Sequence, residues 1–174
     1  MNRNLFVVMT GLPGSGKTTL GRAVAARLGL GLLDKDTMLE ALFDTLGCDG
    51  LPARRQLSRA ADAVLRATAE ACPGAVLVSF WRRAGSDEGG TDAGWLAGLP
   101  GRVVEVHCRC PVEVALARFR ARARHPGHHD GLRSEAALRA QFEAVAARGA
   151  LGGFDLVEVD CSVPWDLERV VGKI

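Results

Sequence analysis

Glycine, lysine and threonine stand at a fixed spacing near the start of the chain, in the run GLPGSGKT at residues 11–18. The run fits the pattern G-x-x-x-x-G-K-S/T, in which backbone amides wrap around phosphate groups. The apolar residues 5–9 before it predict a buried strand, and residues 17–28 after it predict a helix. Strand, glycine loop and helix follow one another in the order that a phosphate site requires, so the sequence predicts a nucleotide site.

Each polar residue of this phosphate loop has an expected role. The ammonium group of Lys17 is expected to contact the β- and γ-phosphates, the Thr18 hydroxyl to bind Mg²⁺, and Thr19 to contact the α-phosphate. Glycines have no Cβ, so the backbone can curl toward an anion, and the start of the helix adds its positive dipole. The predicted nucleotide-binding set is Gly11, Gly14, Ser15, Gly16, Lys17, Thr18 and Thr19.

Two carboxylates, Asp34 and Asp36, follow residues 30–33, which predict a short second strand. One carboxylate at a strand end can support Mg²⁺ through water while the other accepts the proton of an attacking hydroxyl. We assign the metal role to Asp34, and the base and substrate-binding roles to Asp36. Asp36 also leads into a predicted helix that it can cap. Capping alone for Asp36, and a solvated loop acid for Asp34, are the alternative interpretations.

A third polar group follows the continuous apolar run 75–80, which predicts a central strand buried on both faces. Many nucleotide hydrolases end this strand with an acid that supports Mg²⁺. Ser79 stands there instead, which disfavours a motor-type ATPase and moves the metal role to the carboxylates after the second strand. We expect Arg82 or Arg83 to bind the acceptor substrate and Trp81 to form a wall of its pocket, with a basic surface loop as the alternative interpretation.

A helix predicted over residues 111–124 carries arginine at every second position from 118 onward. On a helical wheel these arginines alternate between two flanks, so one pair can face the nucleotide while the other faces solvent. Arginine above a transferring phosphate stabilises transition-state charge. The following loop, 125–131, predicts the tip of a mobile lid over about residues 118–148, and a solvated basic helix is the alternative. The candidate catalytic residues are Lys17, Asp36, Arg118, Arg122 and Arg124.

Size and composition agree with one α/β domain over residues 1–174. Predicted strands alternate with helices throughout, which favours a mainly parallel sheet with helices on both faces. A net charge of +2 is too small to indicate a nucleic-acid partner, and no apolar run reaches membrane-spanning length. The chain leads directly into its first strand without a signal-peptide pattern, and its five cysteines contain no C-x-x-C pair. These features predict a cytoplasmic protein with reduced thiols.

Four stretches carry a resemblance to a known group: GLPGSGKTTL, LLDKDTMLEALF, VVEVHCRCPVEVALARFRARARHPGHHD and VEVDCSVPWDLERVV. In them the chain resembles the small P-loop kinases, which include shikimate kinase, gluconate kinase and chloramphenicol phosphotransferase, and most of all the zeta-toxin-like group of short bacterial kinases labelled AAA family ATPases. The resemblance implies a P-loop NTPase three-layer sandwich, with a five-stranded parallel sheet in the order 2-3-1-4-5 and a helical lid. It also implies ATP as the nucleotide and matches Asp36 to the general base of chloramphenicol phosphotransferase-like enzymes.

The expected activity is an ATP-dependent phosphotransferase acting on a hydroxyl of a small molecule, such as a metabolite, sugar, nucleoside or antibiotic. The protein is expected to be a monomer or a homodimer. A regulatory ATPase with a protein partner is one alternative; it needs a flat apolar surface, whereas a kinase needs a deep cavity beside Asp36. A nucleic-acid-end kinase is the other, and it needs a basic track. The arginines available for such a track are Arg54, Arg55, Arg59, Arg82 and Arg83.

Overall fold

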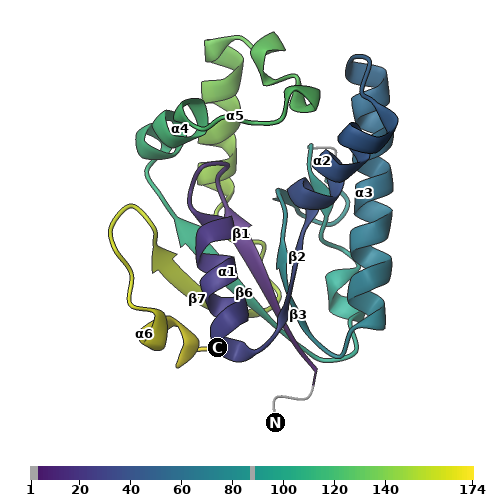
Figure 1. The fold of residues 1–174 in the computed structure, drawn as a ribbon. Coiled ribbons are helices and arrows are strands. Elements are labelled where there is room, and N and C mark those ends of the chain that lie inside the picture. Colours follow the sequence, from purple (N-terminus) through teal and green to yellow (C-terminus); the bar gives the residue numbers. More distant parts are fainter. Residues whose placement is uncertain (1–3, 87–88) are drawn as a thin grey trace.

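The computed structural model describes residues 4–86 and 89–174 of the chain. Its central sheet has five parallel strands in the order β2-β3-β1-β6-β7 (Figure 1). Two further strands of two residues each, β4 (Trp81–Arg82) and β5 (Thr91–Asp92), pair with each other outside this sheet. When the central strands alone are counted along the chain, their order is 2-3-1-4-5, as predicted. They are β1 (Leu5–Gly11), β2 (Gly31–Asp34), β3 (Ala75–Val78), β6 (Arg102–Arg109) and β7 (Asp155–Asp160).

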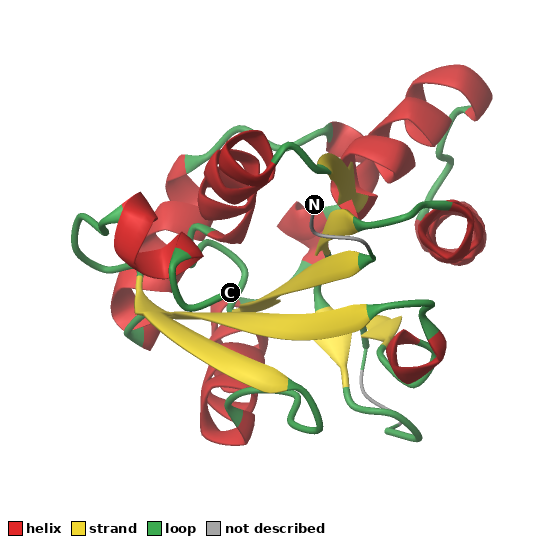
Figure 2. Cartoon of the chain, turned by 90° about the horizontal axis from the view of Figure 1, so that it is seen from below, coloured by secondary structure: helices red, strands yellow, loops and turns green. Residues whose placement is uncertain are grey.

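Helices lie on both sides of this sheet (Figure 2). One face is covered by α1 and α6, and the opposite face by α3 and a short 3-10 segment, while α2 packs on α3. In the described part of the chain no helix has the length and apolar character that crossing a membrane demands. The helices are α1 (Lys17–Leu28), α2 (Lys35–Leu46), α3 (Leu51–Ala71), α4 (Val112–Ala121), α5 (Glu135–Arg148) and α6 (Leu167–Val171).

The side chains of β1 alternate between the two faces of the sheet, so each face needs a covering layer of helices. Val7 and Met9 point to the α1 face, and Phe6 and Val8 point to the α3 face, all without measurable exposure. A strand that is apolar on both faces is stable only between two covering layers, because burial of apolar area supplies most of the favourable free energy. All five strands run in one direction, so their carboxyl ends meet at one edge of the sheet.

Helices α4 and α5 and the segment between them lie beyond this edge, and we refer to them as the lid because the sequence predicts a lid there (Figure 1). Phe119 of α4 meets Phe142 of α5 edge to face, with ring centroids 5.6 Å apart, inside a cluster that includes Leu12 of the phosphate loop. Two 3-10 segments, Pro126–His128 and Asp130–Leu132, connect the two helices. The lid therefore packs directly on the loop that is expected to bind phosphate.

The helix predicted over residues 111–124 is shorter than expected, because α4 ends at Ala121. Arg122 is already extended, with φ −84° and ψ 134°, and His125 before Pro126 is extended as well. A residue that precedes proline is driven out of the helical region by its steric contact with the proline ring. The helical-wheel pairing of the arginines is therefore wrong beyond residue 121, since Arg122 and Arg124 lie on irregular backbone.

Candidate active site

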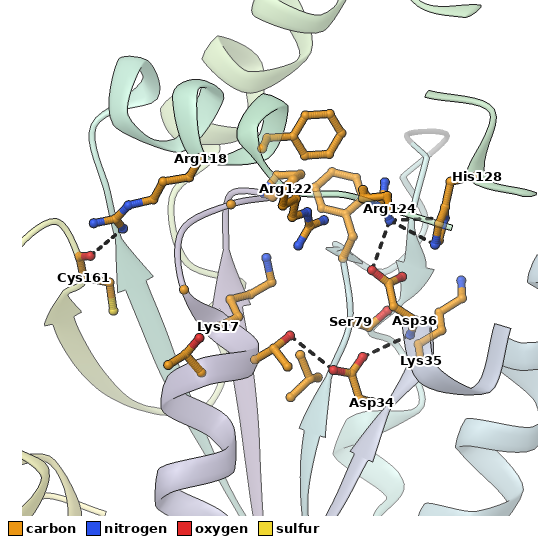
Figure 3. A pocket seen from close by; sticks show the side chains of 18 of the residues that line it. Lys17, Asp34, Lys35, Asp36, Ser79, Arg118, Arg122, Arg124, His128 and Cys161 are labelled. Atoms are coloured by element: carbon orange, nitrogen blue, oxygen red, sulfur yellow. Dashed lines mark hydrogen bonds and ion pairs between the residues drawn. The ribbon is translucent and has the colours of Figure 1, made fainter. Parts of the chain in front are cut away.

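A cavity of about 720 Å³ opens at the carboxyl edge of the sheet, between the phosphate loop, the start of α2, the start of α3 and the lid. This volume falls in the range of small-molecule and cofactor sites. In the view of Figure 3, Lys17 lies between two groups of side chains: Arg118 and Cys161 on one side, and Asp36, Arg124 and His128 on the other. The site thus has a phosphate-binding centre and two distinct ends.

The phosphate loop requires glycine at several of its positions. Gly11, Gly14 and Gly16 all have positive φ, between 77° and 127°. A Cβ on Gly11 would lie 2.4 Å from the Cys108 carbonyl oxygen, and one on Gly14 would lie 2.4 Å from the Ala115 carbonyl oxygen. Those contacts are too short for any side chain, so the curl of the loop depends on glycine.

Ser15 and Lys17 point polar groups into this curl. The Ser15 hydroxyl is fully buried and has no hydrogen-bond partner among the described residues. The Lys17 ammonium donates to the carbonyl oxygens of Gly11 and Leu12, at 3.0 and 2.7 Å. Burial lowers the pKa of Lys17 to about 8, since a buried ammonium loses its hydration. A buried hydroxyl without a partner among the described residues and a destabilised ammonium fit a site that receives an anion.

Thr18 and Asp34 meet at the base of the cavity. The Thr18 hydroxyl donates to Asp34 Oδ2 at 3.2 Å, while Asp34 Oδ1 accepts the backbone N–H of Asp36 at 3.0 Å. Asp34 is therefore the residue that caps α2, and the expectation that Asp36 caps this helix is wrong. Burial, followed by the charge of Asp36, raises the pKa of Asp34. A hydroxyl and a buried carboxylate are the oxygen ligands that Mg²⁺ prefers, and a cation there would stabilise the charged carboxylate.

Asp36 belongs to a chain of polar contacts that joins α2 to the lid. Arg124 donates to Asp36 Oδ2 at 3.1 Å and to Asp130 Oδ2 at 2.5 Å. The same guanidinium nitrogen lies 3.1 Å from Nδ1 and 3.4 Å from Nε2 of His128 (Figure 3). Nε2 of His128 also lies 2.9 Å from Glu40 Oε1. Because an arginine can only donate, a hydrogen bond from Arg124 needs an unprotonated ring nitrogen on His128. A lid arginine therefore holds the predicted base.

His128 fits the neutral form that this chain of contacts requires. Its side chain is 1% exposed, and burial is the main cause that lowers its pKa. The ring of Phe43 meets it edge to face, with centroids 5.4 Å apart. A Cβ on Gly127 would lie 2.6 Å from the same phenyl ring, so the loop can pack this closely only with glycine there. The sequence indicated a lid tip here, but nothing in its pattern linked His128 to Arg124.

Arg118 and Arg122, the other two arginines predicted to be catalytic, also line the cavity. Arg118 donates to the Cys161 carbonyl oxygen at 2.7 Å, which ties α4 to the segment after β7. The Arg122 guanidinium lies over the Phe119 ring, 5.4 Å from its centroid, and burial lowers the pKa of Arg122. Arg118 thus lies at one end of the cavity beside Cys161, and Arg124 lies at the other beside Asp36 (Figure 3).

Trp81, Arg82 and Arg83 do not line this cavity, which corrects the prediction that they bind the acceptor. Strand β3 ends at Val78, and the buried Trp81 indole packs in the core and donates to the Met9 carbonyl oxygen at 3.1 Å. Arg82 is paired with Asp92 at 2.8 Å. Arg83 donates to two carbonyl oxygens near the end of α5, at 2.8 and 3.0 Å. Trp81 and Arg82 thus serve the core and the loop after β3, and Arg83 ties that loop to the end of α5.

The cavity also contains residues that the sequence did not assign to an acceptor. Lys35, at the start of α2, is buried and pairs with Asp62 of α3 at 2.7 Å. Arg54 of α3 lines the same end, and Cys161 to Trp165 line the opposite end. No motif identifies Arg54 or Lys35, because their positions depend on how α2 and α3 pack. Among the described residues no group of three or more His, Cys, Asp and Glu side chains could hold a metal ion by itself.

Comparison with known families decides the assignment. The model of the family AAA_33, described as an AAA domain, matches residues 6–148. The chain belongs to this family of P-loop proteins. A crystal structure of a candidate kinase from Chloroflexus aurantiacus j-10-fl is 30% identical, with a TM-score of 0.80, and the match covers 99% of this chain and 96% of that one. A gluconokinase from Sinorhizobium meliloti shares the fold at 17% identity and a TM-score of 0.56, over 99% of this chain and 90% of that one.

Curated relatives match over a shorter part of this AAA-domain chain. The shikimate kinase of Thermobifida fusca is 44% identical over 64 residues, which cover 34% of this chain and 37% of that enzyme. The shikimate kinase of Mycobacterium tuberculosis strain H37Ra is 42% identical over 65 residues, with 34% and 35% covered. The match thus spans about a third of the length of these curated relatives.

Proposed function

We propose that the protein is an ATP-dependent phosphotransferase that moves the γ-phosphate onto a hydroxyl of a small molecule. The observation that carries this proposal is the placement of Asp36. Its carboxylate lines the same cavity as Lys17 and Thr18, and Arg124 of the lid holds it. A carboxylate beside the phosphate site, with an open cavity next to it, can receive the proton of an acceptor hydroxyl.

The nucleotide half of this function rests on the phosphate loop. The amides of the loop and the Lys17 ammonium would bind the phosphates, and the buried Ser15 hydroxyl is a donor still without a partner among the described residues. Thr18 and Asp34 would hold Mg²⁺, which supplies charge neutralisation between the phosphates when it is bound. Cys161 to Trp165 offer a surface for the base at the end where Arg118 lies. These features support ATP and Mg²⁺ as the cofactors.

The acceptor half rests on α2 and the lid. Asp36 would orient the acceptor hydroxyl and take its proton as the new bond to phosphorus forms. Arg122 and Arg124 would stabilise the negative charge on the transferring group, and Arg118 would fix the lid over the nucleotide. Closing residues of about 118–148 over the cavity would exclude water, which protects ATP from hydrolysis.

The finer classification is part of the same proposal. We place the chain among the zeta-toxin-like and chloramphenicol phosphotransferase-like kinases, as a single domain that acts in the cytoplasm as a monomer or homodimer. The 720 Å³ cavity beside Asp36 supports a kinase over a regulatory switch, which would need a flat apolar surface there. Two of the five arginines that a nucleic-acid-end kinase would need for its basic track, Arg82 and Arg83, are engaged by other groups, which disfavours that alternative.

The direct test is to incubate the protein with γ-labelled ATP, Mg²⁺ and a panel of hydroxylated metabolites, sugars, nucleosides and antibiotics. A labelled organic product that forms with the wild type, and not with Asp36→Asn, supports the proposal. Release of labelled phosphate alone, at a rate that no acceptor changes, would favour the regulatory ATPase.

A further inference from the structure

Three of the five cysteines lie where β6 and β7 end, next to the phosphate loop. Cys108 is on β6, Cys110 lies just beyond the end of that strand, and Cys161 comes directly after β7. The β6–β7 pairing continues past the end of β7, because the Cys161 N–H donates to the Arg109 carbonyl oxygen at 2.8 Å. Cys108 and Cys161 belong to the same buried cluster on the α1 face. All five cysteines fall within the described residues, and all are free thiols.

The side chains of Cys108 and Cys161 contact each other. Their thiols share a hydrogen bond, which together with burial raises the pKa of Cys108. The same hydrogen bond lowers the pKa of Cys161. These opposite directions mean that Cys108 donates its S–H to the Cys161 sulfur, since an accepted hydrogen bond stabilises a thiolate. Cys161 is therefore the sulfur with more thiolate character, and the thiolate is the form that reacts with oxidants.

Cys161 also lines the nucleotide end of the cavity, where Figure 3 draws its side chain close to Arg118. The Arg118 guanidinium donates to the Cys161 carbonyl oxygen at 2.7 Å. The charges of Arg118 and Lys17 favour a Cys161 thiolate, while burial and the charge of Asp160 act against it. Reactive cysteines have cations nearby and a route to solvent, whereas structural cysteines are enclosed by apolar groups. An oxidant as small as a peroxide can reach Cys161 through the cavity.

The two cysteines meet the phosphate loop at two points. A Cβ on Gly11 would lie 2.4 Å from the Cys108 carbonyl oxygen, and a Cβ on Gly16 would lie 3.7 Å from the Cys161 Cβ. A disulfide needs its sulfur atoms about 2.05 Å apart, which is closer than two hydrogen-bonded thiols lie. Closing that gap moves the two strand ends, so it shifts the loop that packs against them.

We propose that Cys108 and Cys161 form an oxidation site, at which hydrogen peroxide converts the two thiols to a disulfide and so weakens nucleotide binding. The Cys161 sulfur attacks one peroxide oxygen: the S–O bond forms, the O–O bond breaks, and the departing hydroxide takes the Cys161 proton to become water. The Cys108 sulfur then attacks the Cys161 sulfur: the S–S bond forms, the S–O bond breaks, and the Cys108 proton leaves with the second water. Two thiols lose two electrons, and one peroxide gains them. The effect on nucleotide binding rests on the proposed function, whereas the disulfide does not.

The first experiment maps the disulfide in the absence of nucleotide. Reduced protein is treated with hydrogen peroxide, the remaining thiols are alkylated, and trypsin digests the protein without reductant. Cleavage after Arg109 puts Cys108 and Cys110 in different peptides, so a link from Cys161 to either one is identified by mass. We expect the link to Cys108, and we expect it to be lost in Cys108→Ser and kept in the control Cys72→Ser, just after α3. A link between Cys110 and Cys161, or no link at Cys161, would overturn the proposal.

The second experiment measures ATP affinity by calorimetry in the same samples. The linked form should bind ATP about tenfold more weakly than the reduced form, and reduction with dithiothreitol should restore the affinity. A saturating non-hydrolysable ATP analogue with Mg²⁺ should slow the linkage, because it covers Cys161 and holds the loop. Linked protein that binds ATP as tightly as reduced protein would overturn the effect on the nucleotide. Reduced protein that binds no ATP would instead count against the phosphotransferase and leave the mapped disulfide standing.

Discussion

The two halves of the cavity are built in different ways. The phosphate-binding part of the nucleotide half comes from one continuous stretch, residues 11–19, and its curl depends on Gly11 and Gly14, where a Cβ would meet backbone atoms. The acceptor half is assembled from side chains of α2, α3 and the lid, with partners such as Asp36 and Arg124 that are 88 positions apart in the chain. Phosphate binding thus depends on local structure, whereas recognition of an acceptor depends on the tertiary fold.

This difference determines which amino-acid substitutions each half of the cavity tolerates. At Gly11 and Gly14 of the phosphate loop, a Cβ atom would lie 2.4 Å from a backbone carbonyl oxygen, so other residues at these two positions are not compatible with the fold. In the acceptor half, each residue contributes a side chain from a regular helix or an irregular segment, so a substitution alters the chemistry and leaves the backbone in place. We therefore expect substitutions in the acceptor half to separate transfer from nucleotide binding.

Asp36→Asn is expected to have the largest effect on transfer. Loss of the base should lower kcat by about 10²- to 10⁴-fold, because an amide cannot accept the hydroxyl proton. Nucleotide affinity, measured by calorimetry, should stay at the wild-type value. Asp49→Asn, at an exposed position just after α2, is the matched control. Transfer at the wild-type rate in Asp36→Asn would remove the functional distinction between the two halves.

Lys17→Met is expected to lower both nucleotide affinity and transfer. The lost ammonium stabilises the phosphates in both the bound state and the transition state, so kcat should fall by about 10²- to 10³-fold. Equilibrium binding of ATP and steady-state kinetics measure the two effects separately. Lys173→Met, at the exposed C-terminal end, provides the control. An unchanged ATP affinity would contradict the placement of Lys17 in the nucleotide half.

The pH dependence of ATP binding tests whether the Lys17 ammonium acts in the nucleotide half. The pKa of Lys17 is lowered to about 8 in the free protein. The ammonium form is therefore complete only below that pH, and bound phosphate would favour it. ATP affinity should be constant between pH 6 and 7 and should fall as pH rises through 8, approaching about tenfold per unit once the neutral amine dominates. Lys17→Arg should remove this fall, since arginine keeps its charge.

His128→Ala tests the acceptor half at a distance from the substrate. Removing the imidazole leaves Arg124 and Glu40 without a shared partner, so Arg124 should hold Asp36 less firmly and kcat should fall about tenfold or more. The KM for ATP should not change. His128→Gln, which can still hydrogen-bond to both neighbours, should recover part of the loss. A purely structural role would lower stability in both variants without separating kcat from KM.

The smallest effect is expected for Arg83→Gln. Its guanidinium contacts carbonyl oxygens near the end of α5 rather than the cavity, so acceptor KM should change by less than about twofold, as for most exposed positions. The same kinetic assay that measures Asp36→Asn provides the comparison. A large rise in acceptor KM in Arg83→Gln would show that the acceptor half extends beyond the cavity.

Local sequence patterns predicted strands and the phosphate loop, but they could not predict contacts between distant parts of the chain. The apolar runs at residues 5–9, 30–33 and 75–80 predicted three of the central strands, and the glycine pattern predicted the curled loop between β1 and α1. Resemblance supplied the strand order and the match of Asp36 to a base. Trp81 and the two arginines after it could not be placed, because the chain leaves β3 at Val78 and turns the indole into the core. The contacts of His128 with Glu40 were equally hidden, since they depend on how the lid returns to α2.

Glu105 lies in the middle of the molecule and is fully buried on β6. Its carboxylate accepts the Thr10 hydroxyl at 2.7 Å and the backbone N–H groups of Leu151 and Gly152, at 2.8 and 3.1 Å. The segment that follows α5 is thus hydrogen-bonded to β6, the strand next to β1, and β1 leads into the phosphate loop. Arg83 also holds the carbonyl oxygens of Arg148 and Ala150, on either side of Gly149, so any swing of the upper helices must pivot before residue 148.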